Sequence, residues 1–149
     1  MDLTRMDWSE LRVWGDVARL NAAAFGDKPA FVGAGTSVSF AQINARINRL
    51  VNALAGLGLS KGDRVAVLSR NRPELFEVYG VAKGGLVAVP LNWRLAAREL
   101  LHPLRDSRPQ VIVAEPDFTP VIDALRPELG SVRHLLVLGA ARDGWSAYE

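Results

Sequence analysis

Residues 64–91, RVAVLSRNRPELFEVYGVAKGGLVAVPL, hold the pattern that decides the fold. The run Arg64–Leu68 is short, apolar and β-branched, which is typical of a strand buried on both faces. The next segment predicts a helix that Asn71 can cap, with Pro73 in its first turn and a glycine pair at its end. Leu86–Leu91 is a second apolar run. Strand, helix and strand in this order predict two parallel strands joined by a crossover.

The same alternation continues toward the C-terminus. Pro103 falls inside the next expected helix, where it removes a backbone hydrogen bond, so we expect a kink or an early end there. The last segment, 144–149, reads as the start of a further helix that is cut off. The expected elements between these points are a helix over Ala96–Asp106, a strand over Val111–Ala114, a helix over Thr119–Leu125 and a strand over Leu135–Leu138.

Toward the N-terminus the pattern is different. Apolar residues between Leu11 and Phe25 predict a helix, and two β-prone stretches, Pro29–Val32 and Thr36–Phe40, are joined by two glycines that suit a tight hairpin. Ser39 lies three residues before Gln42, the spacing of a capping box, so a helix is expected to begin there. Its apolar stripe ends at Gly56 and Gly58, since glycine readily takes the left-handed position that closes a helix.

We therefore predict an α/β fold: a doubly wound, mostly parallel sheet with flanking helices, preceded by a helix and a small β-hairpin. Residues 1–149 are interpreted as one subdomain, part of a larger enzyme. Within it, 1–40 form the helix and hairpin, 41–140 the alternating strands and helices, and 141–149 the truncated start of the next element.

Composition narrows the class of protein. Hydrophobic residues make up 49% and charged residues 23% of the chain, as in an ordinary globular domain. The net charge is only +2 and the basic residues are scattered, so we expect no nucleic-acid partner; Arg46 and Arg49 are assigned to a solvated helix face. There are no cysteines, and residues 1–10 lack the pattern of a secretory signal, so a cytoplasmic location is expected.

Three motifs that could mark a functional site do not meet the requirements of that site. Ser60 lies in a Gly-x-Ser-x-Gly match, but it follows a helix and precedes a strand, the reverse of a nucleophile elbow. The glycines around it, Gly56 to Gly62, follow no strand and do not suit a dinucleotide loop. His102 and His134 lack partners at ligand spacing, so a metal site is not expected. We assign no catalytic, cofactor-binding or metal-binding residue.

Trp93 has two readings. It follows the strand Leu86–Leu91 at its carboxyl end, where open α/β sheets place their ligands. An aromatic side chain packed under a loop is the more ordinary interpretation.

The segment from Ala53 to Glu115 resembles the N-terminal region of AMP-forming acyl-CoA synthetases, and the likeness extends back through Ser39–Ile43 and Phe25–Ala30. The ordered set carries the resemblance: Gly62-Asp63-Arg64-Val65, Asn71 with Glu74, Gly84-Gly85, Val89-Pro90-Leu91-Asn92 with Arg94, and Glu99-Leu100. Ala96 departs from the pattern, because the family often has Thr or Ser there to cap the helix.

The resemblance implies a reaction in which ATP and a carboxylic acid give an acyl-adenylate, from which coenzyme A releases AMP to form a thioester. It implies ATP, Mg and CoA for the full-length enzyme and no cofactor in this chain, because the phosphate-handling loop and the catalytic lysine lie beyond Glu149. The expected partners are the remainder of the same polypeptide and a carboxylic-acid substrate, with self-association through an exposed docking face. Asn92–Leu95 are expected to contribute one wall of the acyl pocket.

Two alternatives stay open. The chain could be a self-sufficient flavodoxin-like binding or interaction module without chemistry of its own. It could also belong to an aryl-acid ligase or a luciferase-like member of the same fold, since the N-terminal residues do not separate these.

Overall fold

The computed structural model describes residues 8–33 and 35–149, so Ala34 in the hairpin turn and the first seven residues of the expected N-terminal segment lie outside the described part. Its elements, in chain order, are η2 (Trp8–Glu10), α1 (Asp16–Phe25), β1 (Pro29–Gly33), β2 (Thr36–Ser39), α2 (Phe40–Gly56), β3 (Arg64–Leu68), α3 (Pro73–Tyr79), η3 (Gly80–Gly84), β4 (Val87–Leu91), α4 (Ala97–Ser107), β5 (Val111–Ala114), η4 (Pro116–Phe118), α5 (Thr119–Leu125), η5 (Arg126–Glu128), β6 (His134–Val137) and β7 (Ser146–Ala147).

The main sheet has five strands in the order β4-β3-β5-β6-β7, and all its pairs are parallel. Numbered within the sheet, this is the order 2-1-3-4-5 of flavodoxin-like doubly wound folds. The chain runs outward from β3 to β4, then returns past β3 to β5. The predicted fold class is confirmed, and the carboxyl ends of β3 and β5 mark the point where the direction of winding reverses.

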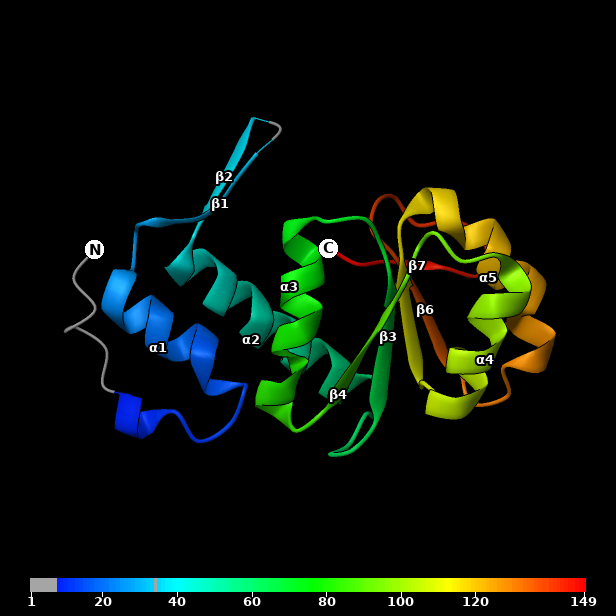
Figure 1. Ribbon diagram of the computed structural model, residues 1–149, viewed down its shortest axis with the longest axis horizontal. Coiled ribbons are helices and arrows are strands. Elements are labelled where there is room, and N and C mark those ends of the chain that lie inside the picture. The colour runs from blue at the N-terminus through cyan, green and yellow to red at the C-terminus, as the bar shows by residue number, and fades with distance from the viewer. Residues whose placement is uncertain (1–7, 34) are drawn as a thin grey trace.

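Each face of the sheet has its own core because side chains alternate along a strand. Helices α4 and α5 cover one face, where Leu104 and Ile122 pack on Ile112 of β5. Helices α2 and α3 cover the other face, where Leu54 and Val78 pack against the next residues along the strands. Figure 1 shows the sheet between these two helical layers, with α1 and the β1–β2 hairpin beyond α2.

Helix α2 begins and ends as its sequence predicts. The Ser39 hydroxyl accepts the Gln42 backbone N–H while the Gln42 side chain accepts the Ser39 N–H, which is the expected capping box. At the other end Gly58 has a φ of 83°, the left-handed region that favours glycine. Among the residues that the structure describes, no helix is both long and apolar enough to cross a membrane.

Three local predictions are wrong. The residue that caps α3 is Arg72 rather than Asn71, and it makes no side-chain cap; Pro73 at the first helical position needs no such acceptor because it has no N–H. Helix α4 continues past Pro103 to Ser107, so the early end, one of the two outcomes expected at this proline, is wrong. The final segment forms β7, a strand parallel to β6, and not the start of a helix.

The N-terminal cap of α4 lacks a side-chain oxygen at Ala96, as the sequence indicates. The Glu99 carboxylate accepts the Ala96 backbone N–H at 2.7 Å, but the Ala96 side chain has no oxygen to return to the helix. We expect Ala96→Ser to raise the free energy of unfolding by about 1 kcal/mol, measured by urea denaturation. Ala55→Ser, at an exposed position inside α2, should give no gain; an equal gain there would contradict the capping explanation.

Candidate functional site

Polar and aromatic side chains gather at the carboxyl ends of the neighbouring strands β4, β3 and β5. Ser69 and Arg70 directly follow β3, Trp93 comes two residues after β4, and Glu115 directly follows β5. Because parallel strands end at the same edge, these residues share the edge at which the winding reverses, the usual ligand position of open α/β sheets. We call Ser69, Arg70, Trp93, Glu115 and Phe118 the carboxyl-edge cluster.

Glu115 ties β3 to β5 within this cluster. Its Oε1 accepts the Ser69 hydroxyl at 2.9 Å and the Arg70 backbone N–H at 2.5 Å, and its Oε2 accepts Arg70 Nη1 at 2.9 Å. The carboxylate is buried, so each of these donors also compensates its desolvation. Hydrogen bonds from Arg70 to Asp117 and to Glu115 raise the pKa of the guanidinium, which therefore stays charged.

The half-buried indole of Trp93 lies among cations. The Arg94 guanidinium carbon is 4.2 Å from the ring centroid of Trp93 and that of Arg70 is 5.5 Å from it, while Arg70 also lies 4.9 Å from the Phe118 ring. The Asn92 carboxamide accepts the Arg94 N–H at 3.0 Å and fixes the turn that follows β4. These contacts favour the packed-aromatic interpretation of Trp93, and the charge of Arg70 is balanced by its ion pairs with Glu115 and Asp117.

The residues whose motifs were rejected in the sequence lie outside this cluster. Neither histidine lies in it: His102 is exposed on α4, and His134 opens β6. Ser60 lies in the turn between α2 and β3, where its N–H donates to Asp63, as expected for an ordinary turn. In the described ranges 8–33 and 35–149, no three potential metal ligands come together.

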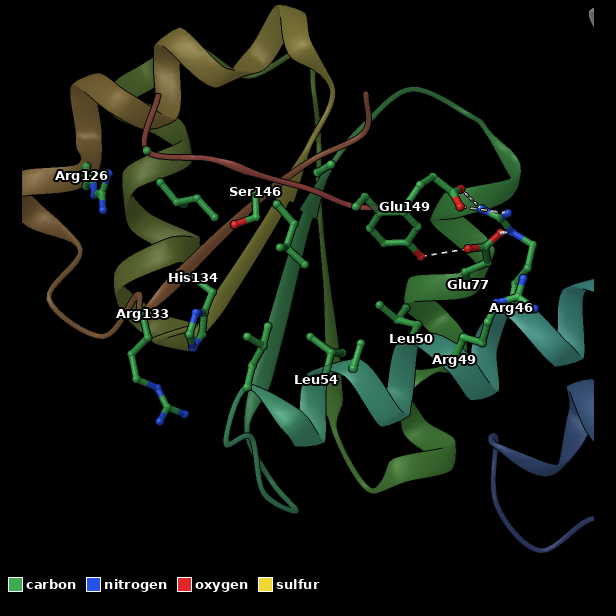
Figure 2. A pocket seen from close by; sticks show the side chains of 17 residues that line it. Arg46, Arg49, Leu50, Leu54, Glu77, Arg126, Arg133, His134, Ser146 and Glu149 are labelled. Carbon is green, nitrogen blue, oxygen red and sulfur yellow. Dashed lines mark hydrogen bonds and ion pairs between the residues drawn. The ribbon is translucent and has the colours of Figure 1, made fainter. Parts of the chain in front are cut away.

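A hollow lies on the face of the sheet that α2 and α3 cover, between α2 and the strands β6 and β7. Figure 2 shows it with Leu50 and Leu54 on one side and Ser146 on another, while Arg133 and His134 lie at one end. Its volume is about 510 Å³. We call it the α2 groove. Its lining residues are Arg46, Arg49, Leu50, Ala53, Leu54, Leu57, Glu77, Arg126, Arg133, His134, Leu135, Leu136, Gly144, Ser146, Ala147, Tyr148 and Glu149.

A buried ionic network closes the other end of the α2 groove. Arg46 Nε donates to Glu77 Oε1 at 2.5 Å and its other nitrogens pair with Glu149, while the Tyr148 hydroxyl donates to Glu77 Oε2 at 2.9 Å (Figure 2). The Glu77 side chain is only 2% exposed and that of Arg46 25% exposed. The assignment of Arg46 to a solvated face is therefore wrong, because its charge neutralises Glu77; Arg49 is exposed as expected.

Tyr148 makes this network sensitive to alkaline pH. Burial and the neighbouring Glu77 raise the pKa of the Tyr148 phenol well above its usual value near 10. Because the Tyr148 phenol ionises more readily in the unfolded chain than in the folded one, its contribution to stability is complete below pH 10. Above pH 10 the unfolded phenol ionises, and this contribution is lost. We expect Tyr148→Phe to lose less stability than the parent between pH 9.5 and 11, as measured by urea unfolding across that pH range. Parallel losses in both proteins would contradict this reading.

The sequence patterns did not reveal Arg70, Glu115 or the network around Glu77. Arg70 and Glu115 could have been predicted from their positions in the sequence, because each lies within two residues of the end of a buried strand of the predicted sheet. Glu77 gave no signal, since an acidic residue in a helix ordinarily faces water.

These features define the class of protein as a doubly wound α/β domain whose carboxyl edge carries aromatic side chains and ion-paired arginine. A family model described as AMP-binding enzyme matches residues 18–148. The chain belongs to this family of AMP-binding enzymes.

Individual relatives agree with that assignment. The long-chain-fatty-acid–CoA ligase FadD13 of Mycobacterium tuberculosis is 47% identical over 66% of this chain and 20% of its own length. A long-chain-fatty-acid–CoA ligase of Thermus thermophilus is 34% identical over 98% of this chain and 28% of its own. A solved structure described as a long-chain-fatty-acid CoA ligase from Rhodopseudomonas palustris superposes with a TM-score of 0.85 at 34% identity, over 91% of this chain and 35% of that one. The chain thus spans a third or less of the curated relatives it matches.

Proposed function

We propose that this chain supplies the N-terminal scaffold of an AMP-forming acyl-CoA ligase acting on a fatty acid. The match over residues 18–148 to the AMP-binding enzymes carries this proposal. The 47% identity to the long-chain-fatty-acid–CoA ligase FadD13 supports a fatty acid as substrate, while ligases for indoleacetate and 3-hydroxybenzoate match at 38% and 33%. In the full-length enzyme, ATP and the acid form an acyl-adenylate and pyrophosphate, and coenzyme A then displaces AMP.

Within such an enzyme, the residues of this chain would hold the strand ends and the turn after β4 in place. They would not take part in the reaction themselves. Glu115 holds the ends of β3 and β5 together, and Asn92 fixes the turn that presents Trp93 and Arg94. Asn92–Leu95 would form one wall of the acyl pocket. ATP, Mg and CoA would be held by parts of the polypeptide outside these 149 residues. A cytoplasmic location and self-association through an exposed face remain predictions.

An activity assay on the purified chain alone tests whether its residues only position the active site. Purified chain should show no dodecanoate-dependent exchange of labelled pyrophosphate into ATP, because no residue is placed to stabilise the charge that develops in adenylate formation. The Mycobacterium tuberculosis ligase FadD13, assayed in parallel, is the positive control. Exchange by the chain alone, above a boiled-protein blank, would mean that the active site had been placed wrongly.

A second candidate function has one observation in its favour. The strand order is that of a complete flavodoxin-like sheet, so the chain could act as a binding module by itself. A module of this kind should melt cooperatively as a monomer at all concentrations, whereas a scaffold with an uncovered face should associate as concentration rises. Sedimentation velocity over a hundredfold range of concentration separates the two.

A further inference from the structure

The α2 groove lies where one face of the sheet lacks a helix. On the opposite face α4 and α5 cover the strands from β4 to β6. On this face α2 and α3 pack on β3 and β5. Beyond α2, the two residues of β7, Ser146 and Ala147, are exposed. Doubly wound sheets normally bury both faces. Here the part of the α2–α3 face formed by β7 is not covered.

The floor of the groove is apolar and continues the core. Leu50 and Leu54 of α2 and Leu136 of β6 are buried members of one core cluster. Next to them, Ala53 is exposed and Leu57 keeps 39% of its surface accessible. Positions 46, 49, 50, 53, 54 and 57 recur at spacings of three and four, so one face of α2 supplies this wall. Small side chains opposite, at Gly144, Ser146 and Ala147, leave room for a backbone to approach closely.

The rim of the groove is basic. Arg49, Arg126 and Arg133 line it together with His134. Within the described part of the chain, Arg49 and Arg126 form no ion pair, and Arg133 reaches only Asp63, at 3.4 Å. The acidic residues of the lining, Glu77 and Glu149, are already paired with Arg46. The free charge facing an incoming group is therefore positive.

We propose that the α2 groove seats an amphipathic helix with acidic flanks, supplied by the part of the longer polypeptide that lies outside these 149 residues. The apolar floor takes the helix's leucine-like stripe, and the arginine rim pairs with its carboxylates. The relatives, of which the chain covers 20–28%, have the length to supply such a segment. The proposal rests on the proposed function in one respect: it takes the helix to come from the same longer enzyme.

Peptide mapping tests the proposal. Overlapping fluorescent peptides of about 20 residues, near the length of a long globular helix, would tile the part of FadD13 outside the 104 residues that match this chain. Anisotropy should identify at least one binding peptide, and the binding peptides should be acidic and amphipathic. Binding should weaken at least about tenfold in Arg49→Glu/Arg133→Glu and in Ala53→Trp. Arg98→Glu, on exposed surface of α4, is the matched control and should bind like the parent.

Several outcomes would overturn the proposal. These are the absence of any binding peptide, a preference for basic peptides, or equal weakening by Arg98→Glu. Self-association that the groove variants abolish, without peptide binding, would make a second copy the occupant instead. The pyrophosphate-exchange assay reads none of these contacts, so failure of the groove proposal is distinguishable from failure of the proposed function.

Discussion

Replacing Glu77 by alanine should destabilise the chain by about 3 kcal/mol or more. The Glu77 carboxylate is almost fully buried and is held by Arg46 and Tyr148. Its removal leaves a half-buried guanidinium and a buried hydroxyl without their common acceptor, and breaking one side of a buried pair typically costs about 3–5 kcal/mol. The remaining contact of Arg46 with Glu149 is exposed on the glutamate side and compensates little. Urea denaturation monitored by tryptophan fluorescence measures the loss.

The control for this prediction is Glu74, one turn earlier on α3. Its ion pair with Arg72 at 2.9 Å is more exposed, so Glu74→Ala should cost no more than about 1 kcal/mol. A loss below 1 kcal/mol for Glu77→Ala, or equal losses for both variants, would contradict the view that the network anchors α2, α3 and the C-terminal segment together.

Gly80→Ala should produce the second large effect, a loss of about 2 kcal/mol. A Cβ at Gly80 would lie 2.5, 2.6 and 2.8 Å from Cδ1, Cγ1 and Cγ2 of Ile47. Ile47 is itself only 2% exposed, so it cannot swing into solvent, and overpacking of this kind typically costs about 1–3 kcal/mol. The glycine is therefore required by the close approach of α2 to the end of α3, not by a turn.

A double-mutant cycle checks this cause. Ile47→Ala alone should cost about 2–5 kcal/mol through the cavity it leaves. In Gly80→Ala/Ile47→Ala the new methyl group enters that cavity, so the double variant should lose less than the two single losses added together. Strict additivity would show that Gly80 acts through backbone conformation instead.

The sequence predicts the main sheet well because its strands are buried on both faces. The runs Val65–Leu68 and Val111–Ala114 contain no polar residue that could suggest another structure, and both strands form as expected. The capping box at Ser39 is equally local, since it involves residues three apart. Predictions of this kind succeed because the interactions that decide them are encoded within one segment.

The errors come from interactions between distant segments. The two residues of β7 are too few to show a periodicity, and they become a strand only because β6 offers a free edge. Arg46 lies on a polar stretch of α2, but the partner that buries it comes from α3, 31 residues away. The carboxyl-edge cluster joins residues from three strand ends in the same way. Spacing along the chain does not specify such pairs.

A chimeric ligase tests the central claim most directly. The segment of Mycobacterium tuberculosis FadD13 that matches this chain would be replaced by the corresponding residues from here, and dodecanoate-dependent pyrophosphate exchange would be measured. If these residues form the scaffold of an AMP-forming acyl ligase, the chimera folds and retains exchange within about tenfold of the parent enzyme. A chimera that folds, by its circular dichroism and melting curve, yet shows no exchange would contradict the account.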